Sequence, residues 1–248
     1  MGYLCLKLFA VLLFCSNITA YERLLTPCKQ TDSVCLRTSC TELLNRTCKG
    51  VGEPYNIAPF DPLELPPMEF TGIGEPVTKI NMRKIKVEGL KDMMLGELIL
   101  DPVDKTIRFN ATAVYLFSAG IKIDFVGKEK NYTGFAMTTL KTSVHVQYPF
   151  SLDRDENGGL HLVIHPETST CEPMETPVFT YCPNLTEKLN NDPDVKEMRE
   201  KYKTEIMEVN RKFACTISDL AFPALIDVFR KASKIMTMQD YFLDFKEE

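Results

Sequence analysis

The sequence predicts an α+β fold in which a strongly curved antiparallel β-sheet wraps a long C-terminal helix. Two changes of hydrophobic period along the 248-residue chain carry this prediction. From Val77 to about Thr180, apolar and polar side chains alternate, with turns roughly every ten to fifteen residues, as is typical of antiparallel strands. From Asp192 onward, apolar residues recur at steps of three and four, as is typical of an amphipathic helix. Packing the sheet on the helix buries both apolar faces.

The predicted C-terminal helix has a well-defined start. Asp192, Pro193 and Asp194 supply an N-cap, a proline at the first helical position and an acidic first turn. The apolar stripe stays in phase across Pro223, where we expect a kink rather than an end. Its members are Val195, Met198, Tyr202, Ile206, Val209, Phe213, Ile217, Leu220, Ala224 and Val228. Apolar residues off the stripe beyond Ala221 predict that the second half is buried on more than one side.

A short amphipathic helix is predicted over residues 33–48. Leu36, Cys40, Leu43 and Leu44 fall on one face, and the glycines that follow the segment end it. Residues 40 and 48 would lie about 12 Å apart along this helix, too far for a disulfide, so Cys40 is expected to be a buried free thiol. The next segment, Pro54–Pro76, holds six of the fifteen prolines and is expected to be extended.

Residues 1–20 have the pattern of a secretory signal peptide. Lys7 precedes a short apolar run, Leu8 to Phe14, and small and polar residues follow it up to an expected cleavage after Ala20. The apolar run is too short to span a bilayer, so a secreted protein without stable membrane insertion is expected. A single domain over residues 21–248 remains. It keeps seven of the nine cysteines, and an oxidising compartment favours disulfides among them.

Composition and motifs argue against several function classes. The formal net charge of −5 gives no excess of cations for nucleic acid. No C-x2-C pair is present, and His161 and His165 would lie about 13 Å apart on a strand, so neither a metal site nor a cofactor is expected. No G-x-S-x-G motif or activated cysteine supplies a nucleophile, so the chain is not expected to be an enzyme. Four N-x-[ST] sequons are glycosylation candidates, at Asn45, Asn110, Asn131 and Asn184.

Three segments and the cysteine spacing carry a family resemblance. They are GVGEPYNIAPFDPL, VQYPFSLDRDENGGLHLVIHPETSTCEP and KASKIMTMQDYF, with cysteines seven residues apart at 28 and 35 and forty-four apart at 171 and 215. Together they resemble the insect haemolymph juvenile hormone-binding protein and takeout family, and most closely its moth juvenile hormone-binding branch. The resemblance covers essentially all of residues 21–248.

The resemblance implies more than the pattern does. Pattern alone leaves open whether the helix–sheet interface is packed solid or keeps a cavity. The family implies a tubular lipid-binding fold with a buried hydrophobic tunnel, a gate formed by the short N-terminal helix, and disulfides Cys28–Cys35 and Cys171–Cys215. Cys48 and Cys182 depart from the family pattern and would either pair with each other or leave one thiol free.

Two single positions bear on the ligand. Tyr148, in VQYPF, occupies the position of the family tyrosine whose hydroxyl meets the epoxide end of the hormone. Ala58 stands where the moth carriers are expected to have Trp, so the tunnel wall is expected to differ there.

The expected function is that of a secreted, monomeric haemolymph carrier, which binds juvenile hormone, a sesquiterpenoid epoxide ester, and protects and transports it. Two alternatives stay open at this point. One is a takeout-like carrier of fatty acids or other lipids, and the other is a secreted signalling protein with a filled core.

Overall fold

A computed structural model describes residues 24–246, so the predicted signal peptide, residues 1–20, lies outside the described part of the chain. Its helices are α2 (Ser33–Thr47), α3 (Pro183–Asn191), α4 (Pro193–Lys201), α5 (Lys203–Ile235) and α6 (Met238–Tyr241), with a short 3₁₀ turn, η1, at Leu90–Asp92. Its strands are β1 (Leu63–Leu65), β2 (Met68–Thr71), β3 (Thr78–Glu88), β4 (Met94–Asp101), β5 (Thr106–Phe125), β6 (Asn131–Arg154), β7 (Leu160–Ile164), β8 (Thr168–Pro173) and β9 (Thr180–Tyr181).

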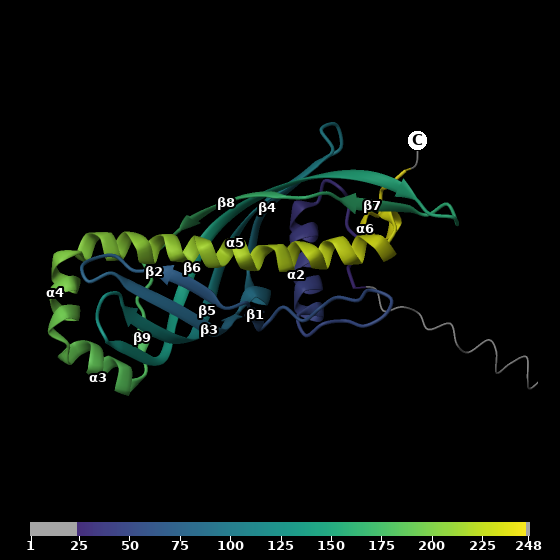
Figure 1. Cartoon of the computed structure of the whole chain (residues 1–248). Coiled ribbons are helices and arrows are strands. Elements are labelled where there is room, and N and C mark those ends of the chain that lie inside the picture. Colours follow the sequence, from purple (N-terminus) through teal and green to yellow (C-terminus); the bar gives the residue numbers. More distant parts are fainter. Residues whose placement is uncertain (1–23, 247–248) are drawn as a thin grey trace, which may run out of the picture.

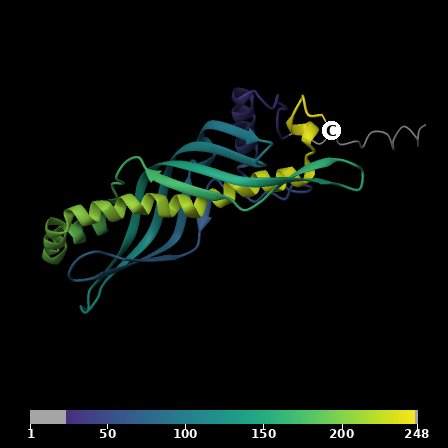
Figure 2. The same cartoon turned by 90° about the horizontal axis from the view of Figure 1, so that it is seen from above.

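The sheet is built on one long hairpin. Strands β5 and β6 pair without a break, from Thr106 opposite Pro149 to Asp124 opposite Asn131. Strands β3 and β4 pair with the free edge of β5, and β7, β8 and β9 pair with the free edge of β6. Along β5, buried residues alternate with less buried ones, so one face of the sheet lies against the core. The sheet curls around one side of α5, which confirms the predicted fold class (Figures 1 and 2).

The long helix differs from the prediction at its start. We expected one helix from Asp192, but it is divided at Tyr202, where φ is −115° and ψ is 28°. In Figure 1, α4 turns away from the axis of α5 at this point. The reason lies in contacts with the turn between β5 and β6, because Lys130 pairs with Asp192 and Lys128 pairs with Asp194. These ion pairs hold α4 against the end of the sheet. Beyond Tyr202 the helix is continuous through Pro223 to Ile235.

The short N-terminal helix forms as predicted. The Asp32 side chain caps α2 by accepting a hydrogen bond from the backbone N–H of Cys35 at 3.0 Å. Leu43 and Leu44 are fully buried and attach the helix to the core. Cys40 is a free thiol, as predicted, although the residue as a whole is only partly buried. The buried face of α2 is not fully apolar, because Ser39 and Thr47 are also buried.

Both disulfides implied by the family resemblance are formed. The Cα atoms of Cys28 and Cys35 are 5.7 Å apart, and those of Cys171 and Cys215 are 5.5 Å apart. Cys40, Cys48 and Cys182 are free thiols, so Cys48 and Cys182 do not pair with each other. The long bridge ties β8 to α5, and the short one ties the start of α2 to the preceding segment.

The segments at the two ends of the described chain pair with each other. The backbone N–H of Cys28 donates to the carbonyl of Tyr241, and the N–H of Leu243 donates to the carbonyl of Cys28, both at 2.9 Å. The N–H of Gln30 donates to the side chain of Asp244 at 3.0 Å. Because Cys28 is also bonded to Cys35 of α2, the base of α2 is joined to the segment that contains α6. None of the described helices is long and apolar enough to cross a membrane.

Candidate functional site

Tyr148 lies on β6, opposite Ile107 of β5, and its side chain is only 5% exposed. Its ring packs edge-to-face on Phe109, with ring centroids 6.4 Å apart. No described residue forms a hydrogen bond with the Tyr148 hydroxyl. Every fully enclosed side-chain nitrogen or oxygen of the described residues has a partner, so this hydroxyl must border on space that a solvent-sized group can reach. The phenol thus has a donor that no described residue uses.

The surroundings of Tyr148 come from several elements. Burial raises the pKa of Tyr148, and Cys40 of α2 adds to that rise, whereas Arg230 of α5 opposes it. Burial raises the pKa of the Cys40 thiol to about 12. It also raises the pKa of Tyr241 in α6, with further contributions from Cys40 and Tyr148. All three groups are therefore neutral at physiological pH, and the predicted gate helix α2 places its thiol near the tyrosine that the resemblance singles out.

An ion pair lies close to this end of the interior. Arg230 donates to the carboxylate of Glu167 and, at 3.1 Å, to the carbonyl of His165. Both charged side chains are partly exposed, and each is compensated by the other. The two charges of this pair therefore compensate each other at the Tyr148 end.

An apolar cavity of about 210 Å³ lies toward the other end of the sheet. It is lined by Phe70, Thr71, Gly72, Ile80, Met82, Ile121, Ile123, Ala136, Phe179, Tyr181, Val209, Asn210, Lys212, Phe213 and Thr216. Phe213 packs edge-to-face against three other phenylalanines, with centroids 5.0 to 5.4 Å apart. On β6, Ala136 and Tyr148 are twelve residues apart, which is about 40 Å along a strand. This distal cavity is therefore remote from Tyr148, which does not line it.

A buried polar cluster that the sequence analysis missed lies between these two regions. The Tyr115 hydroxyl of β5 contacts the Ser218 hydroxyl of α5 and donates to the carbonyl of Ala214 at 3.2 Å. The hydroxyls of Ser218 and Thr142 of β6 are 3.0 Å apart. Burial raises the pKa of Tyr115, so it stays protonated and can donate. The sequence signal was weak, since one serine in a helical stripe and one tyrosine in a strand are unremarkable separately.

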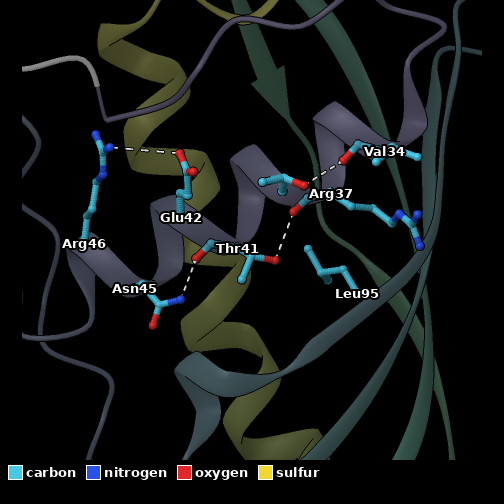
Figure 3. Close-up of a pocket in the computed structure, with 8 residues that line it drawn as sticks. Val34, Arg37, Thr41, Glu42, Asn45, Arg46 and Leu95 are labelled. Atoms are coloured by element: carbon cyan, nitrogen blue, oxygen red, sulfur yellow. Dashed lines mark hydrogen bonds and ion pairs between the residues drawn. The ribbon is translucent and has the colours of Figure 1, made fainter.

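The other candidate residues lie on the surface. Asn45, Asn110, Asn131 and Asn184 are all exposed. Figure 3 shows Asn45 on the outer face of α2, where its side chain donates to the carbonyl of Thr41 at 3.1 Å, beside the Arg46–Glu42 ion pair. Their glycosylation remains a prediction. Ala58 is exposed, whereas its neighbours Ile57 and Phe60 are buried, and its expected effect on the tunnel wall stays a prediction.

The histidines of β7 and the loop after it are used within the fold. The Nδ1 of His161 lies 3.1 Å from the carbonyl of Met236, and the Nε2 lies 3.3 Å from Asp155. The Nε2 of His165 lies 3.0 Å from the hydroxyl of Ser151. Among residues 24–246, no group of three or more histidine, cysteine or acidic side chains is placed to hold a metal ion.

Comparisons with known proteins agree with the fold. A family model described as "Haemolymph juvenile hormone binding protein (JHBP)" matches residues 8–120. The chain is 24% identical over 221 residues to the juvenile hormone-binding protein of Manduca sexta, covering 89% of this chain and 96% of that relative. The crystal structure of Takeout 1 from Epiphyas postvittana superimposes with a TM-score of 0.66 at 14% identity, covering 87% of this chain and 98% of that one. In sequence and in fold, the chain is thus similar to haemolymph juvenile hormone-binding proteins and to Takeout 1, as the resemblance implied.

Proposed function

We propose that the protein is a secreted haemolymph carrier that binds juvenile hormone, or a closely similar isoprenoid epoxide ester, and that it is not an enzyme. The observation that carries the proposal is the buried Tyr148 hydroxyl, which has no partner among the described residues. A buried polar group normally has a hydrogen-bond partner, so an unpaired donor in an apolar wall suits a ligand that brings one acceptor into an apolar environment. An epoxide oxygen at one end of a terpenoid chain is such an acceptor.

The chemistry around Tyr148 suits a neutral ligand. Because burial raises the pKa of Tyr148, its hydroxyl stays protonated and donates to the epoxide oxygen. Cys40 and Tyr241 are kept neutral by the same cause, so no charged side chain of this group competes for the ligand. A carboxylate would lose its hydration here without gaining a cation as partner, since Arg230 is already bound to Glu167. The Tyr148 end therefore favours an ester over a free acid.

The energetics are dominated by apolar contact. A ligand of about fifteen carbons gains roughly 10 kcal/mol at about 0.8 kcal/mol per buried carbon group. Association opposes this with at least about 4 kcal/mol, and one hydrogen bond adds about 1 kcal/mol. The expected affinity is micromolar or somewhat better, with selectivity supplied by Tyr148 and by shape.

Ligand entry requires the α2 end to open. The distal cavity, at about 210 Å³, is smaller than the roughly 300 Å³ at which drug-sized ligand sites begin, so it does not hold a whole hormone molecule. Met236 and Met238, just before and at the start of α6, are buried, and their unbranched side chains rearrange readily. We expect α2 to move outward on ligand entry and to close over the bound hormone.

Competition binding tests the proposal. Recombinant protein with both disulfides intact is titrated with labelled juvenile hormone in the presence of unlabelled hormone, its free acid or a saturated fatty acid. We expect the ester to compete at least about tenfold better than either acid. Equal competition by the fatty acid would support the second candidate function, a takeout-like lipid carrier, which the distal cavity with Lys212 in its lining favours. Failure of folded protein to bind any of these ligands would instead support the signalling alternative.

A further inference from the structure

Near the middle of α5, small side chains face the sheet. Three small residues, Ala214, Ser218 and Ala221, are fully buried at a helical spacing of four and three. Small side chains let a helix backbone approach its neighbour closely, and the carbonyl of Ala214 is indeed 3.2 Å from the Tyr115 hydroxyl of β5. At this contact a hydrogen bond joins the α5 backbone directly to a β5 side chain.

Hydrogen bonds hold this narrow point together from three elements. Ser218 of α5 bonds both to Tyr115 of β5 and to Thr142 of β6. All three residues are at most 1% exposed. A chain of apolar ligand atoms passing through this point would have to separate these hydroxyls and leave them unpaired in a dry environment, which is strongly unfavourable. Displacing the cluster is therefore harder than displacing apolar side chains of the same size.

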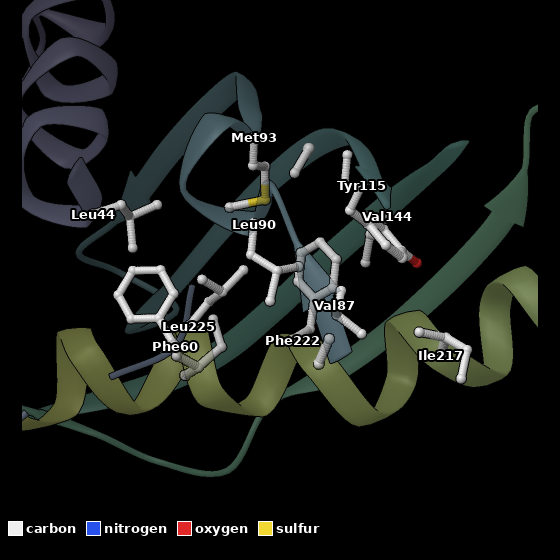
Figure 4. Packing of buried hydrophobic residues seen from close by; sticks show 14 of the residues in the cluster. Leu44, Phe60, Val87, Leu90, Met93, Tyr115, Val144, Ile217, Phe222 and Leu225 are labelled. Atoms are coloured by element: carbon white, nitrogen blue, oxygen red, sulfur yellow. The ribbon is translucent and has the colours of Figure 1, made fainter. Parts of the chain in front are cut away.

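Aromatic rings close the same level on its distal side. Phe117 follows Tyr115 by two residues on the same face of β5, and its ring packs edge-to-face on Phe213 of α5 at 5.0 Å. Phe213 also lines the distal cavity, whereas Phe117 and Tyr115 are not among its lining residues. Figure 4 shows Tyr115 above the Ile217 part of α5, whereas Leu44 of α2 lies beyond Leu225, further along the helix.

The position of the cluster is midway between the two regions. Thr142 is six residues from Tyr148 and six from Ala136 on β6, which corresponds to about 20 Å in each direction. The cluster thus lies between the part of the helix–sheet interior toward Tyr148, α2 and α6 and the part toward the distal cavity. The structure brings residues of three elements to the boundary between them.

We propose that Tyr115, Thr142, Ala214 and Ser218 form a partition that separates two binding compartments and limits the length of ligand that the Tyr148 compartment accepts. A terpenoid ester fits within about 20 Å, whereas a long straight chain meets the partition. That the Tyr148 compartment binds juvenile hormone rests on the proposed function, but the partition itself does not. The ligands that the partition excludes from the Tyr148 compartment are long-chain lipids.

Single-tryptophan reporters test the partition, because the chain contains no Trp. Phe109→Trp places a fluorophore beside Tyr148, and Val209→Trp places one in the lining of the distal cavity. Each variant is titrated with juvenile hormone, decanoic acid and octadecanoic acid, and the shift in Trp emission is recorded. The Phe109→Trp variant is used only after its unfolding transition matches that of the wild type.

We expect hormone to shift the emission of Phe109→Trp and to leave that of Val209→Trp unchanged. We also expect decanoic acid to bind at the Phe109→Trp reporter at least about tenfold more tightly than octadecanoic acid. Its half-saturating concentration at the Val209→Trp reporter should differ from that at Phe109→Trp. This order is the reverse of that expected from apolar area alone, which favours the longer chain. The proposal is wrong if octadecanoic acid binds more tightly and shifts both reporters at one half-saturating concentration, or if neither acid shifts either reporter.

Opening the partition supplies the complementary test. In Tyr115→Ala, added to each reporter, octadecanoic acid should bind at least about tenfold more tightly than without it, and both reporters should respond together. Leu185→Ala is the control, because it removes a fully buried side chain of α3 outside the proposed partition. If Tyr115→Ala does not fold, the Thr142→Ala/Ser218→Ala double variant removes the hydroxyl links with a smaller loss of volume and should act in the same direction. If octadecanoic acid binds no more tightly in either variant, the partition is contradicted. If the length limit is observed but the hormone does not bind, only the proposed function is contradicted.

Discussion

Replacing Tyr148 by Phe separates a ligand-binding role from a structural one. In the free protein the Tyr148 hydroxyl has no hydrogen-bond partner among the described residues, so removing it breaks no such bond there. The free energy of unfolding should stay within about 0.5 kcal/mol of the wild-type value, because no hydrogen bond within the protein is lost. With hormone bound, the same change removes one neutral hydrogen bond. Hormone affinity should fall by about 1 kcal/mol, which is about fivefold.

Tyr115→Phe is the matched control, since it removes a buried phenol hydroxyl from the neighbouring strand β5. That hydroxyl does have partners, the carbonyl of Ala214 and the hydroxyl of Ser218. Its loss leaves both partners short of a bond in a dry environment, and the free energy of unfolding should fall by about 1–3 kcal/mol. The affinity for hormone should stay close to that of the wild type. Tyr148→Phe should therefore weaken hormone binding without lowering stability, whereas Tyr115→Phe should lower stability without weakening binding.

The assay combines urea unfolding of the ligand-free proteins with competition binding of labelled hormone and a fatty acid. The reasoning is refuted if Tyr148→Phe lowers stability as much as Tyr115→Phe does, because the hydroxyl would then have a structural role. It is also refuted if Tyr148→Phe weakens hormone and fatty acid equally, since the loss would then come from the shape of the pocket.

Three further predictions concern stability and thiol chemistry. Asp192→Asn should lower the free energy of unfolding by about 2 kcal/mol in urea titrations near neutral pH. Although burial opposes it, hydrogen bonds from Lys130 and Tyr132 lower the pKa of Asp192, so the wild type should lose this advantage as the pH falls below about 4. Backbone N–H groups lower the pKa of Cys182, whereas that of Cys40 is about 12, so maleimide at pH 8 should modify Cys182 first, as peptide mapping would reveal. Replacing the bridge between residues 171 and 215 by two serines should lower stability by about 4 kcal/mol, measured by the same urea titration.

The long elements could be predicted because their signal is local and repeated. The alternation along β5 and β6 and the stripe along α5 each extend over many residues, so single exceptions do not hide them. The break at Tyr202 could not be predicted in this way. It depends on ion pairs between α4 and the β5–β6 turn, more than sixty residues earlier in the chain, and no local pattern at residue 202 reports them.

The candidate site was predictable only in part. The motif around Tyr148 came from a family resemblance, and nothing in the sequence indicates that its hydroxyl lacks a partner. The cluster of Tyr115, Thr142 and Ser218 was missed because the stripe was traced through large apolar residues, while the small residues set the closest approach of α5. Which hydroxyls meet is decided by the β5–β6 register and the helix position, and both are tertiary properties.

The pairing between the segments around Cys28 and Tyr241 also has a consequence for biosynthesis. A chain emerges from the ribosome with its N-terminal end first, so Cys28–Cys35 can form while most of the sheet is still unmade. The hydrogen bonds from Cys28 to the α6 segment have to wait for nearly the last residues described, as does burial of Met238 and Phe242. The segment that contains α6 is therefore among the last parts of the molecule to pack, and a nascent chain stalled before residue 236 would leave exposed the apolar surface that this segment covers.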